Sequence, residues 1–257
     1  MRDLLSDPEG AAANDPEQRA RELSKRELPK RFYKKAEAAK VDGGFAIHLD
    51  GRAVKTPAKV TLLLPTLTLA EAVAAEWEAQ EKEIDPGKMP LTRISNSAQD
   101  AVTSKFADVA DEITRFVGND ALCYRADGPE TLVTRQRELW DPVLNWAGDA
   151  LGGVFVLIEG IIHKEQPEAL LSSFRTRLDA LSPLQLSALH TATTLTGSAV
   201  LAYALFEKRV TADEAWKAAF VEEDWNIERW GEDAESSQMR VYKRKEFDAA
   251  VLILEQA

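Results

Sequence analysis

The sequence predicts an α+β protein, with a small N-terminal antiparallel β domain followed by a larger C-terminal α-helical domain. Three observations lead to this fold class. Between residues 31 and 64 the apolar residues recur at every second position, which is the period of a half-buried strand. From residue 68 onward they recur at every third or fourth position, which is the period of an amphipathic helix. The 257 residues, 45% hydrophobic and 29% charged, are typical of a globular protein with one large domain or two smaller ones.

These patterns divide the chain into three predicted parts. Residues 1–28 are polar and charged without an apolar period, so we expect a flexible arm. Residues 29–90 are expected to form the β domain with a linking helix, and residues 91–257 the α-helical domain. The first 18 residues contain acids and no long apolar run, which is unlike a secretory signal or a mitochondrial transit peptide. We therefore expect a cytoplasmic protein of bacterial type.

The β domain should contain three or four strands. Phe45, Ile47 and Leu49 alternate with smaller or polar residues, and Asp50-Gly51 directly after them is a strong hairpin turn. Residues 60–64 predict a further strand that ends at a proline.

A linking helix should begin at a capping box formed by Thr68 and Glu71. Its stop is expected at Asp85-Pro86-Gly87, and residues 89–92 are expected to be an extended link. The apolar stripe of this helix contains Leu69, Val73, Trp77 and Ile84.

Trp77 on that stripe is expected to be a core residue that joins the two domains. Glu76 and Gln80 lie one turn apart on an adjacent face. We expect them to be the solvent-facing or hydrogen-bonding residues of the helix.

Beyond residue 90 the helical period dominates. One apolar stripe over residues 94–116 predicts a single long helix that ends at Gly118-Asn119. In the next helix Asp141 is expected to be a cap and Pro142 the first residue of a new segment. Residues 154–158 could be a strand or a buried turn.

Four further helical segments follow. Residues 167–181 predict a helix, and Ser182-Pro183 opens a largely apolar one that continues to Phe206 and should be the centre of the helical domain. Thr211 and Glu214 form a second capping box, which begins a helix that should carry Trp216, Phe220 and Trp225. The last segment covers residues 246–255.

Composition and spacing exclude several classes of function. The net charge of −11 is unfavourable for binding nucleic acid or an anionic membrane surface, and no apolar run approaches the ~18 residues of a membrane span. Cys123 is the single cysteine and is expected to be buried. His48, His163 and His190 have no metal-ligand spacing, so no metal is expected. The chain lacks a glycine-rich phosphate loop, and we expect no cofactor and no catalytic residue.

An acidic stretch remains as the candidate surface. Residues 222–235 contain seven acids, interleaved with Trp225 and Trp230. We expect these acids near the C-terminal end of a helix that Gly231 terminates, where the helix dipole disfavours negative charge. The stretch could be a solvated acidic face with both tryptophans in the core. It could equally be an acidic rim around an aromatic anchor where a protein partner docks.

Six motifs in one order resemble a known family. They are RFYKK (31–35), LDGRAVKTPAK (49–59), EWEAQ with DPGKMPLTRISNSAQD (76–100), NDALCYRA (119–126), WDPVLNW (140–146) and EEDWNIERWGED (222–233). Together they cover most of the chain, from about Arg31 almost to its end. The chain resembles the assembly chaperones of the F-type ATP synthase catalytic head, the family that acts on the α subunit.

The resemblance implies a chaperone that binds the unassembled ATP synthase α subunit and shields its apolar interface until the β subunit replaces it. In that family an acid within the last motif is implicated in chaperone function, and we carry this role to Glu222 and Glu223. The predicted partner-binding residues are Glu222, Glu223, Trp225, Trp230, Glu76 and Gln80. The chaperone should be monomeric and without enzymatic activity, cytoplasmic in bacteria and in the mitochondrial matrix for eukaryotic relatives.

Two alternatives from other classes stay open. The first is an enzyme with a carboxylate-based site in a cleft between the domains, which convergent acids of raised pKa in a well-formed pocket would favour. The second is a structural adaptor or stable subunit of a larger complex, which a large apolar exposed face would favour.

Overall fold

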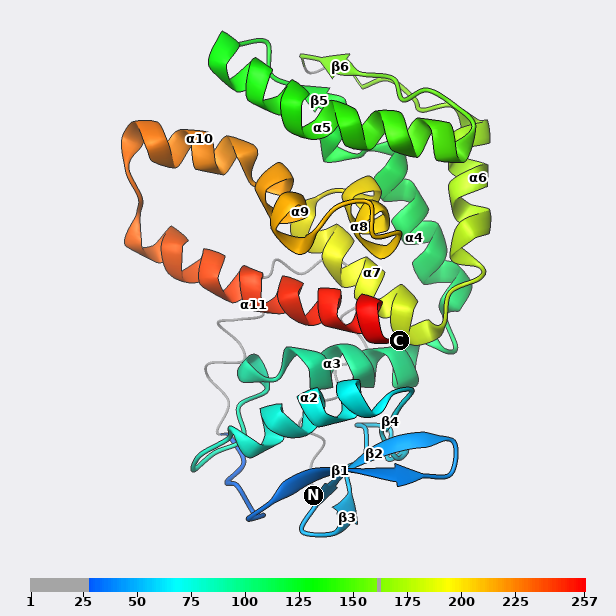
Figure 1. Cartoon of the computed structure of the whole chain (residues 1–257), viewed down its shortest axis with the longest axis vertical. Helices are drawn as coiled ribbons and strands as arrows, with labels where there is room; N and C mark the ends of the chain where they lie inside the picture. The colour runs from blue at the N-terminus through cyan, green and yellow to red at the C-terminus, as the bar shows by residue number, and fades with distance from the viewer. Residues whose placement is uncertain (1–27, 161–162) are drawn as a thin grey trace. The chain divides into compact units, whose positions relative to one another are not determined.

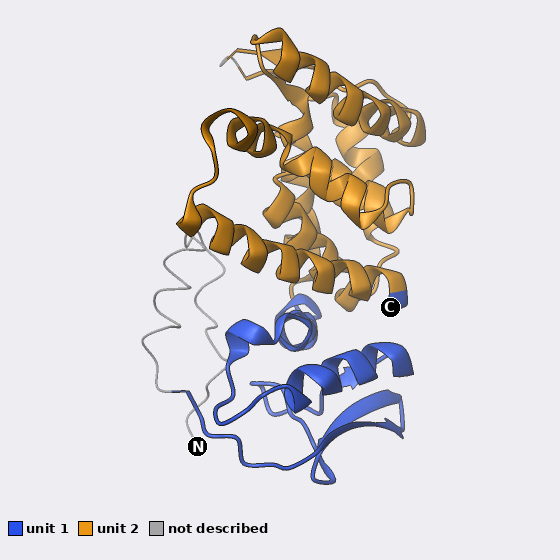
Figure 2. Cartoon of the chain, turned by 60° about the vertical axis from the view of Figure 1, so that its left-hand side comes forward, with its two compact units in different colours: residues 1–104, 256–257 blue, residues 105–255 orange. Residues whose placement is uncertain are grey.

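The computed structural model describes residues 28–160 and 163–257, and these form two compact units (Figure 2). Of the described residues, 28–104 together with Gln256–Ala257 form unit 1, and 105–160 with 163–255 form unit 2. The predicted arm, 1–28, lies outside the described residues except for Leu28. An antiparallel sheet in unit 1 and a larger helical unit 2 confirm the predicted α+β class (Figure 1).

A small antiparallel sheet forms one layer of unit 1. It contains β1 (Ala36–Val41), β2 (Gly44–Leu49), β3 (Arg52–Ala53) and β4 (Leu63–Leu64), and β2 pairs with the other three. Asp50 and Gly51 both have positive φ angles, 47° and 81°, as a tight hairpin turn between β2 and β3 requires. The predicted turn is therefore confirmed, and the strand predicted over residues 60–64 is reduced to two residues.

Helix α2 (Leu67–Glu78) forms the second layer, since it packs against β1 and β2. Its N-cap is Thr66, whose hydroxyl accepts a hydrogen bond from the backbone N–H of Leu69. The predicted capping box of Thr68 and Glu71 is wrong, because the helix starts two residues earlier with another threonine.

The same helix also ends earlier than predicted. It stops at Glu78, and Asp85 instead caps a short 3-10 helix, η1 (Pro86–Lys88), through the backbone N–H of Gly87. Ile84 is buried, but it lies outside the helix.

Helix α3 (Pro90–Ser97) replaces the extended link predicted for residues 89–92, because Pro90 is tolerated at the first helical position. It continues into a π-helical turn, η2 (Ala98–Val102), and the chain then turns before α4 (Phe106–Gly118). The single helix predicted over residues 94–116 is therefore two helices. The contacts place α3 in unit 1, whereas the sequence-based division placed residues from 91 onward in the helical domain.

Unit 2 is built from helices α4 to α11. After α4 come η3 (Ala121–Cys123), β5 (Tyr124–Arg125), α5 (Glu130–Leu151), β6 (Ile158–Glu159), α6 (Glu168–Leu178), α7 (Pro183–Thr196), α8 (Ala199–Phe206), α9 (Ala212–Ala219), α10 (Val221–Trp230) and α11 (Ala234–Gln256).

Helix α8 is the centre of unit 2. All of its residues from Ala199 to Leu205 are buried, and it packs against α4, α5, α7 and α9. This confirms the predicted centre, although the helix predicted from Pro183 to Phe206 is interrupted. Gly197, with φ of 69°, ends α7, and Ser198 caps α8 by accepting a hydrogen bond from Leu201 N at 2.9 Å.

Helix α5 runs through Pro142, so the predicted new segment with Asp141 as its cap is wrong. The carboxylate of Asp141 instead lies 2.7 Å from the guanidinium of Arg125. Because Arg125 belongs to β5, this ion pair fixes the strand to α5. Residues 158–159 form β6, which pairs in parallel with β5, so part of the ambiguous 154–158 segment is a strand.

Asp120 connects two distant parts of unit 2. Its side chain is fully buried and accepts backbone hydrogen bonds from Leu122 at 3.1 Å and from Val200, at the start of α8, at 2.9 Å. Burial raises the pKa of Asp120 to about 6, against the lowering effect of these N–H donors, so the carboxylate is mostly ionised at neutral pH. Cys123 beside it is buried, as predicted.

We predict that Asp120→Asn lowers the free energy of unfolding by about 2–4 kcal/mol, because an amide nitrogen would face N–H donors inside the core. Urea unfolding at neutral pH measures the change. The matched control is Asp127→Asn on the exposed loop nearby, which should leave the unfolding midpoint unchanged. Equal midpoints for Asp120→Asn and the wild type would contradict the role of this carboxylate.

Candidate functional site

Residues 222–230 of the acidic stretch lie in helix α10, and their position corrects the sequence-based interpretation. Phe220 ends α9 and precedes α10, so Glu222, Glu223 and Asp224 lie in the first turn of a new helix. The expectation that these acids lie near a C-terminal helix end is wrong. The helix is interrupted at Phe220, where no glycine or proline in the sequence marks the end of α9. The capping box of Thr211 and Glu214, which begins α9, is confirmed.

This position reverses the electrostatic argument. Negative charge near a helix N-terminus is stabilised by the helix dipole, so these acids need no partner protein to explain their place. They also have partners within unit 2. Glu222 accepts a hydrogen bond from Gln136 of α5 at 2.6 Å, and Arg240 of α11 pairs with Glu223 at 3.4 Å and with Asp224.

The α10–α11 hairpin, residues 221–245, has few buried side chains. Val221 is the single buried residue of α10, and the first half of α11, up to Lys245, has no buried side chain. The hairpin is held mainly by polar contacts, which include Arg135 of α5 against Glu228 at 2.5 Å. Helix α10 runs toward the tip of the hairpin, and α11 runs back from it (Figure 1).

The two tryptophans of α10 have different environments. Trp225 is half-buried, donates a hydrogen bond from Nε1 to Thr131 Oγ1 at 3.2 Å, and lies under the guanidinium of Arg229, 4.7 Å from its ring centre. Trp230 is 80% exposed at the C-terminal end of the helix. The interpretation that placed both tryptophans in the core is therefore wrong for Trp230.

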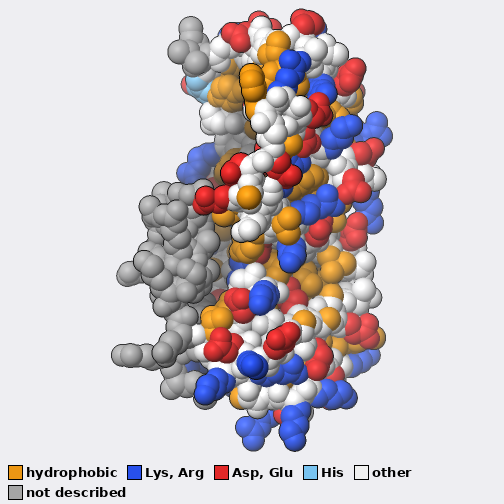
Figure 3. Space-filling view, turned by 90° about the vertical axis from the view of Figure 1, so that its left-hand side faces the viewer, with side chains coloured by type: hydrophobic (Ala, Val, Ile, Leu, Met, Phe, Trp, Pro, Cys, Tyr) orange, Lys and Arg blue, Asp and Glu red, His pale blue; other side chains and the backbone are white. Residues whose placement is uncertain are grey.

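Further exposed apolar side chains lie on the same hairpin. Val241 of α11 is 59% exposed and Tyr242 is 37% exposed. This end of unit 2 faces the viewer in Figure 3, where acidic and hydrophobic side chains lie beside one another. A surface on which large exposed apolar residues are flanked by charged ones has the composition of a protein-docking site.

The other two predicted site residues, Glu76 and Gln80, have internal roles in unit 1. The carboxylate of Glu76 accepts hydrogen bonds from the backbone N–H groups of Leu91 at 2.7 Å and Thr92 at 2.8 Å, and from the Thr92 hydroxyl at 2.7 Å. It thereby caps the start of α3, whose own N-cap, Met89, offers no side-chain acceptor. Burial raises the pKa of Glu76, although these hydrogen bonds act in the opposite direction.

Gln80 is buried, with 4% of its surface exposed. Its amide donates a hydrogen bond to Glu76 O at 2.9 Å and accepts one from Asp85 N at 2.8 Å. The predicted hydrogen-bonding role of this pair is confirmed, and a solvent-facing position is wrong for Gln80. Trp77 between them is buried in unit 1, where its ring lies 5.9 Å from that of Tyr33.

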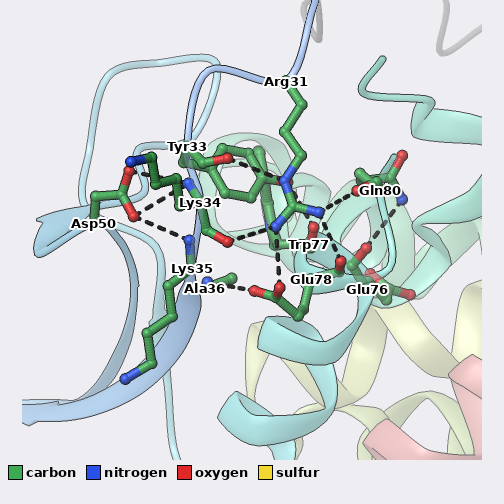
Figure 4. Close-up of polar contacts among 10 residues, drawn as sticks. All are labelled: Arg31, Tyr33, Lys34, Lys35, Ala36, Asp50, Glu76, Trp77, Glu78 and Gln80. Carbon is green, nitrogen blue, oxygen red and sulfur yellow. Dashed lines mark hydrogen bonds and ion pairs between the residues drawn. The ribbon is translucent and has the colours of Figure 1, made fainter. Parts of the chain in front are cut away.

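Arg31, the first residue of the 31–35 motif, was not predicted to be a site residue, but it organises the end of α2 (Figure 4). Its guanidinium donates hydrogen bonds to the carbonyls of Glu78 at 2.9 Å and of Gln80, and to the Glu78 carboxylate at 3.0 Å. A cation near the C-terminal carbonyls of a helix satisfies them and interacts favourably with the dipole.

The acids Glu78 and Asp50 complete this network. The carboxylate of Glu78 also accepts a hydrogen bond from Ala36 N at 2.7 Å, and that bond, followed by the Arg31 contact, lowers its pKa. Asp50 accepts hydrogen bonds from the backbone N–H groups of Lys34 and Lys35. Three of the sequence motifs, 31–35, 49–59 and 76–80, therefore meet in one place for a structural reason.

The described residues give no support for a catalytic or metal centre. No group of three or more His, Cys, Asp or Glu side chains with a metal-binding arrangement occurs within residues 28–160 and 163–257. Two carboxyls of the described residues, Glu76 and Asp120, have raised pKa values, and both accept backbone hydrogen bonds within their own units. In the part of the chain that the structure describes, no helix is long and apolar enough to span a membrane.

Comparison with known proteins identifies the family. The chain is similar to the structure of Atp12 from Paracoccus denitrificans, with 37% sequence identity, a TM-score of 0.80, and coverage of 89% of this chain and 98% of that one. The chain belongs to the ATP12 chaperone family. The family model, described as ATP12 chaperone protein, matches residues 30–148.

Other relatives agree with this assignment. The crystal structure of the Atu1473 protein of Agrobacterium tumefaciens, described as a candidate chaperone, is 46% identical with a TM-score of 0.86, and the alignment covers 100% of this chain and 97% of that one. The mitochondrial protein atp12 of Schizosaccharomyces pombe is 24% identical over 239 residues, which cover 87% of this chain and 81% of the relative. The ATP12 chaperone fold therefore extends over both units of this chain.

We expect Arg31→Lys to lower the free energy of unfolding by about 1–3 kcal/mol, because an ammonium group cannot reproduce the planar fork that reaches four backbone carbonyls and a carboxylate. Arg52→Lys on the exposed strand β3 is the matched control. Urea unfolding compares the two variants with the wild type, and a loss shared equally by both would contradict a specific role for Arg31.

For the acidic turn we expect Glu223→Lys to lower the melting temperature by about 2–4 °C, since it replaces an ion pair with Arg240 by a like-charge contact and places a cation at a helix N-terminus. The sequence-based placement of this acid near a helix C-terminus, where the dipole disfavours negative charge, would instead make the substitution neutral or stabilising. Glu232→Lys, in the loop beyond α10, changes the net charge equally and should leave the melting temperature unaltered. A melting temperature for Glu223→Lys at or above the wild-type value would contradict a stabilising role of this acid at the helix N-terminus.

Proposed function

We propose that this ATP12-family chain is a chaperone of ATP synthase assembly that binds the unassembled α subunit through its α10–α11 hairpin. The chaperone shields the apolar interface of the α subunit until the β subunit takes its place. It acts as a monomer in the bacterial cytoplasm. Its mitochondrial relatives would act in the matrix. Family membership supports the chaperone role. The exposure of Trp230 supports the α10–α11 hairpin as the surface that binds the client.

An exposed tryptophan is the strongest single argument for this surface. Burying an aromatic side chain of this size in a partner removes a large apolar area from water, and tryptophan is enriched among the residues that dominate binding energy. Trp230 is 80% exposed at the tip of a hairpin whose fold does not depend on burying it. The side chain is therefore available to a client at little cost to the chaperone's own stability.

The acids contribute differently from the aromatic anchor. Glu222 is exposed at the start of α10, and Glu223 is only partly covered by Arg240, which leaves both accessible to a basic side chain of the client. Charges at the rim of an interface mainly steer association and select partners. We propose this role for Glu222 and Glu223, and we propose that Trp225 supports the helix that presents them.

Glu76 and Gln80 would take part in client binding indirectly. Both side chains are engaged in joining α2, η1 and α3, so their effect on a client would be exerted through the shape of unit 1. Substitutions at these positions should therefore change stability and client binding together.

Release needs a competitor rather than an energy source. The sequence has no phosphate-binding loop, so the exchange would be driven by the tighter complex that the α subunit forms with β. A mixed surface of one aromatic anchor and a charged rim allows moderate affinity, because buried area alone does not determine binding strength.

The function is tested by an aggregation assay with the isolated ATP synthase α subunit, followed by light scattering. We expect the wild-type chain to suppress aggregation at equimolar concentration and to leave the complex when purified β subunit is added. Trp230→Ala should raise the chaperone concentration required by about tenfold, the effect of removing one anchor residue. Its melting temperature should not change, because the side chain is exposed.

Val154→Ala is the matched control for this assay. Val154 is also an apolar residue of unit 2 and is 81% exposed, but it lies in the loop between α5 and β6. It should protect the α subunit as the wild type does. Protection by Trp230→Ala equal to that of the wild type would contradict the choice of surface. Absence of protection by the wild type would contradict the function. A chain that stays bound in the assembled enzyme would be an adaptor.

A further inference from the structure

A groove in unit 1 lies between the outer edge of the sheet and α2. It has a volume of about 600 Å³ and is floored by alanines of both elements, with three glutamates around it. The alanines that line it are Ala36 and Ala38 of β1, Ala74 and Ala75 of α2, and Ala79 directly after that helix. Because alanine side chains are short, the space above them is open to larger side chains from a partner.

Strand β1 presents unpaired backbone groups along this groove. Among the described residues it pairs with β2 alone, so its other side is an edge of the sheet. In an antiparallel pair, alternate residues direct their N–H and C=O groups away from the partner strand. Val41 and Gly44 close the two-residue turn, so Val41, Ala39 and Glu37 bond to β2.

The remaining residues of β1, Ala36, Ala38 and Lys40, therefore point outward. The hydrogen bond from Ala36 N to the Glu78 carboxylate, at 2.7 Å, is consistent with this direction. Within the described part of the chain, no hydrogen bond engages the N–H groups of Ala38 or Lys40. Open strand edges are normally protected, since they pair readily with another chain.

The charges around the groove identify the chemistry of the occupant. Glu37 is paired with Lys35 and Glu78 with Arg31, but Glu71 has no ion-pair partner among the described residues. A second copy would bring the same acids together, with a net charge of −11 on each chain. The groove therefore suits a segment that carries a cation, and like charges disfavour self-pairing.

We propose that the outer edge of β1 and the alanine-lined face of α2 bind an extended segment of the α subunit by strand addition. The client strand bonds to the outward N–H and C=O groups of Ala38 and Lys40. It directs apolar side chains over Ala75 and Ala79 and places a lysine or arginine beside Glu71. Strand addition obtains affinity from main-chain hydrogen bonds and specificity from alternate side chains.

This inference rests on the proposed function for the identity of the client, but it concerns a separate surface. Main-chain recognition requires the client segment to be extended and unpaired. An unassembled subunit meets this condition where its strand or loop has not yet been covered by a neighbour. The β1 groove would thus distinguish the unassembled from the assembled state of the client.

The experiment compares Lys40→Pro with Lys40→Ala in the aggregation assay with the isolated α subunit. Proline removes the outward N–H and is tolerated on an edge strand, whereas alanine removes the charge and keeps the N–H. We expect Lys40→Pro to need about tenfold more chaperone for the same protection and Lys40→Ala to behave as the wild type. In parallel, the fast-exchanging amides of the peptide 36–41 in the wild type should exchange about tenfold more slowly when the α subunit is bound.

The charge of the groove is tested by Glu71→Lys, with Glu81→Lys in the exposed segment after α2 as its control. Only the first should weaken protection. Unchanged exchange in residues 36–41, or equal protection by Glu71→Lys and Glu81→Lys, overturns the inference. If Lys40→Pro fails to fold, the exchange measurement on the wild type decides the question.

The failure of this inference can be told apart from the failure of the proposed function. Normal protection by Lys40→Pro together with loss of protection by Trp230→Ala leaves the hairpin function intact and removes the β1 groove. A wild-type chain that gives no protection at all removes both. A dimer of the wild type that Lys40→Pro abolishes would assign the edge to a second copy and also overturn the inference.

Discussion

The need to satisfy helix ends governs how this chain is assembled. Each helix leaves unpaired N–H groups at its start and C=O groups at its end, and several helices of this fold are short, so such ends are frequent. Side chains from distant segments supply the missing partners. Arg31 completes the end of α2, Glu76 caps the start of α3, and Asp120 holds the start of α8. Each of these contacts joins two segments that are separated in sequence and satisfies a helix terminus at the same time.

This constraint explains which features were predictable. Local signals were readable, such as the Asp50-Gly51 turn, the Thr211 and Glu214 capping box, and the apolar run that became α7 and α8. Non-local caps were not, because nothing near Glu76 in the sequence indicates that its carboxylate will meet Leu91 N. Breaks at Phe220 and after Val102 were missed for a related reason, since the apolar period continues across them. The exposure of Trp230 also depends on tertiary packing, so sequence alone left its two interpretations open.

The motifs that carry the family resemblance divide into two kinds. Those around Arg31, Asp50 and Glu78 converge on one hydrogen-bonded network inside unit 1, and their residues are occupied by the fold. Most of the last motif, residues 222–230, forms a helix with few buried side chains and an exposed tryptophan. A side chain that the fold does not use is the better candidate for binding a client. This contrast, rather than the number of acids, favours the α10–α11 hairpin as the docking surface.

Hydrogen exchange of the complex between this chaperone and the isolated α subunit tests this central claim most directly. Mass spectrometry of peptides from residues 221–245 would be compared for the free and bound chaperone. Because that hairpin has few buried side chains, its amides should exchange readily in the free protein and slowly in the complex. Slowed exchange over residues 221–245 is the result that the account predicts. Unchanged exchange there, in a complex that still protects the α subunit from aggregation, would contradict it.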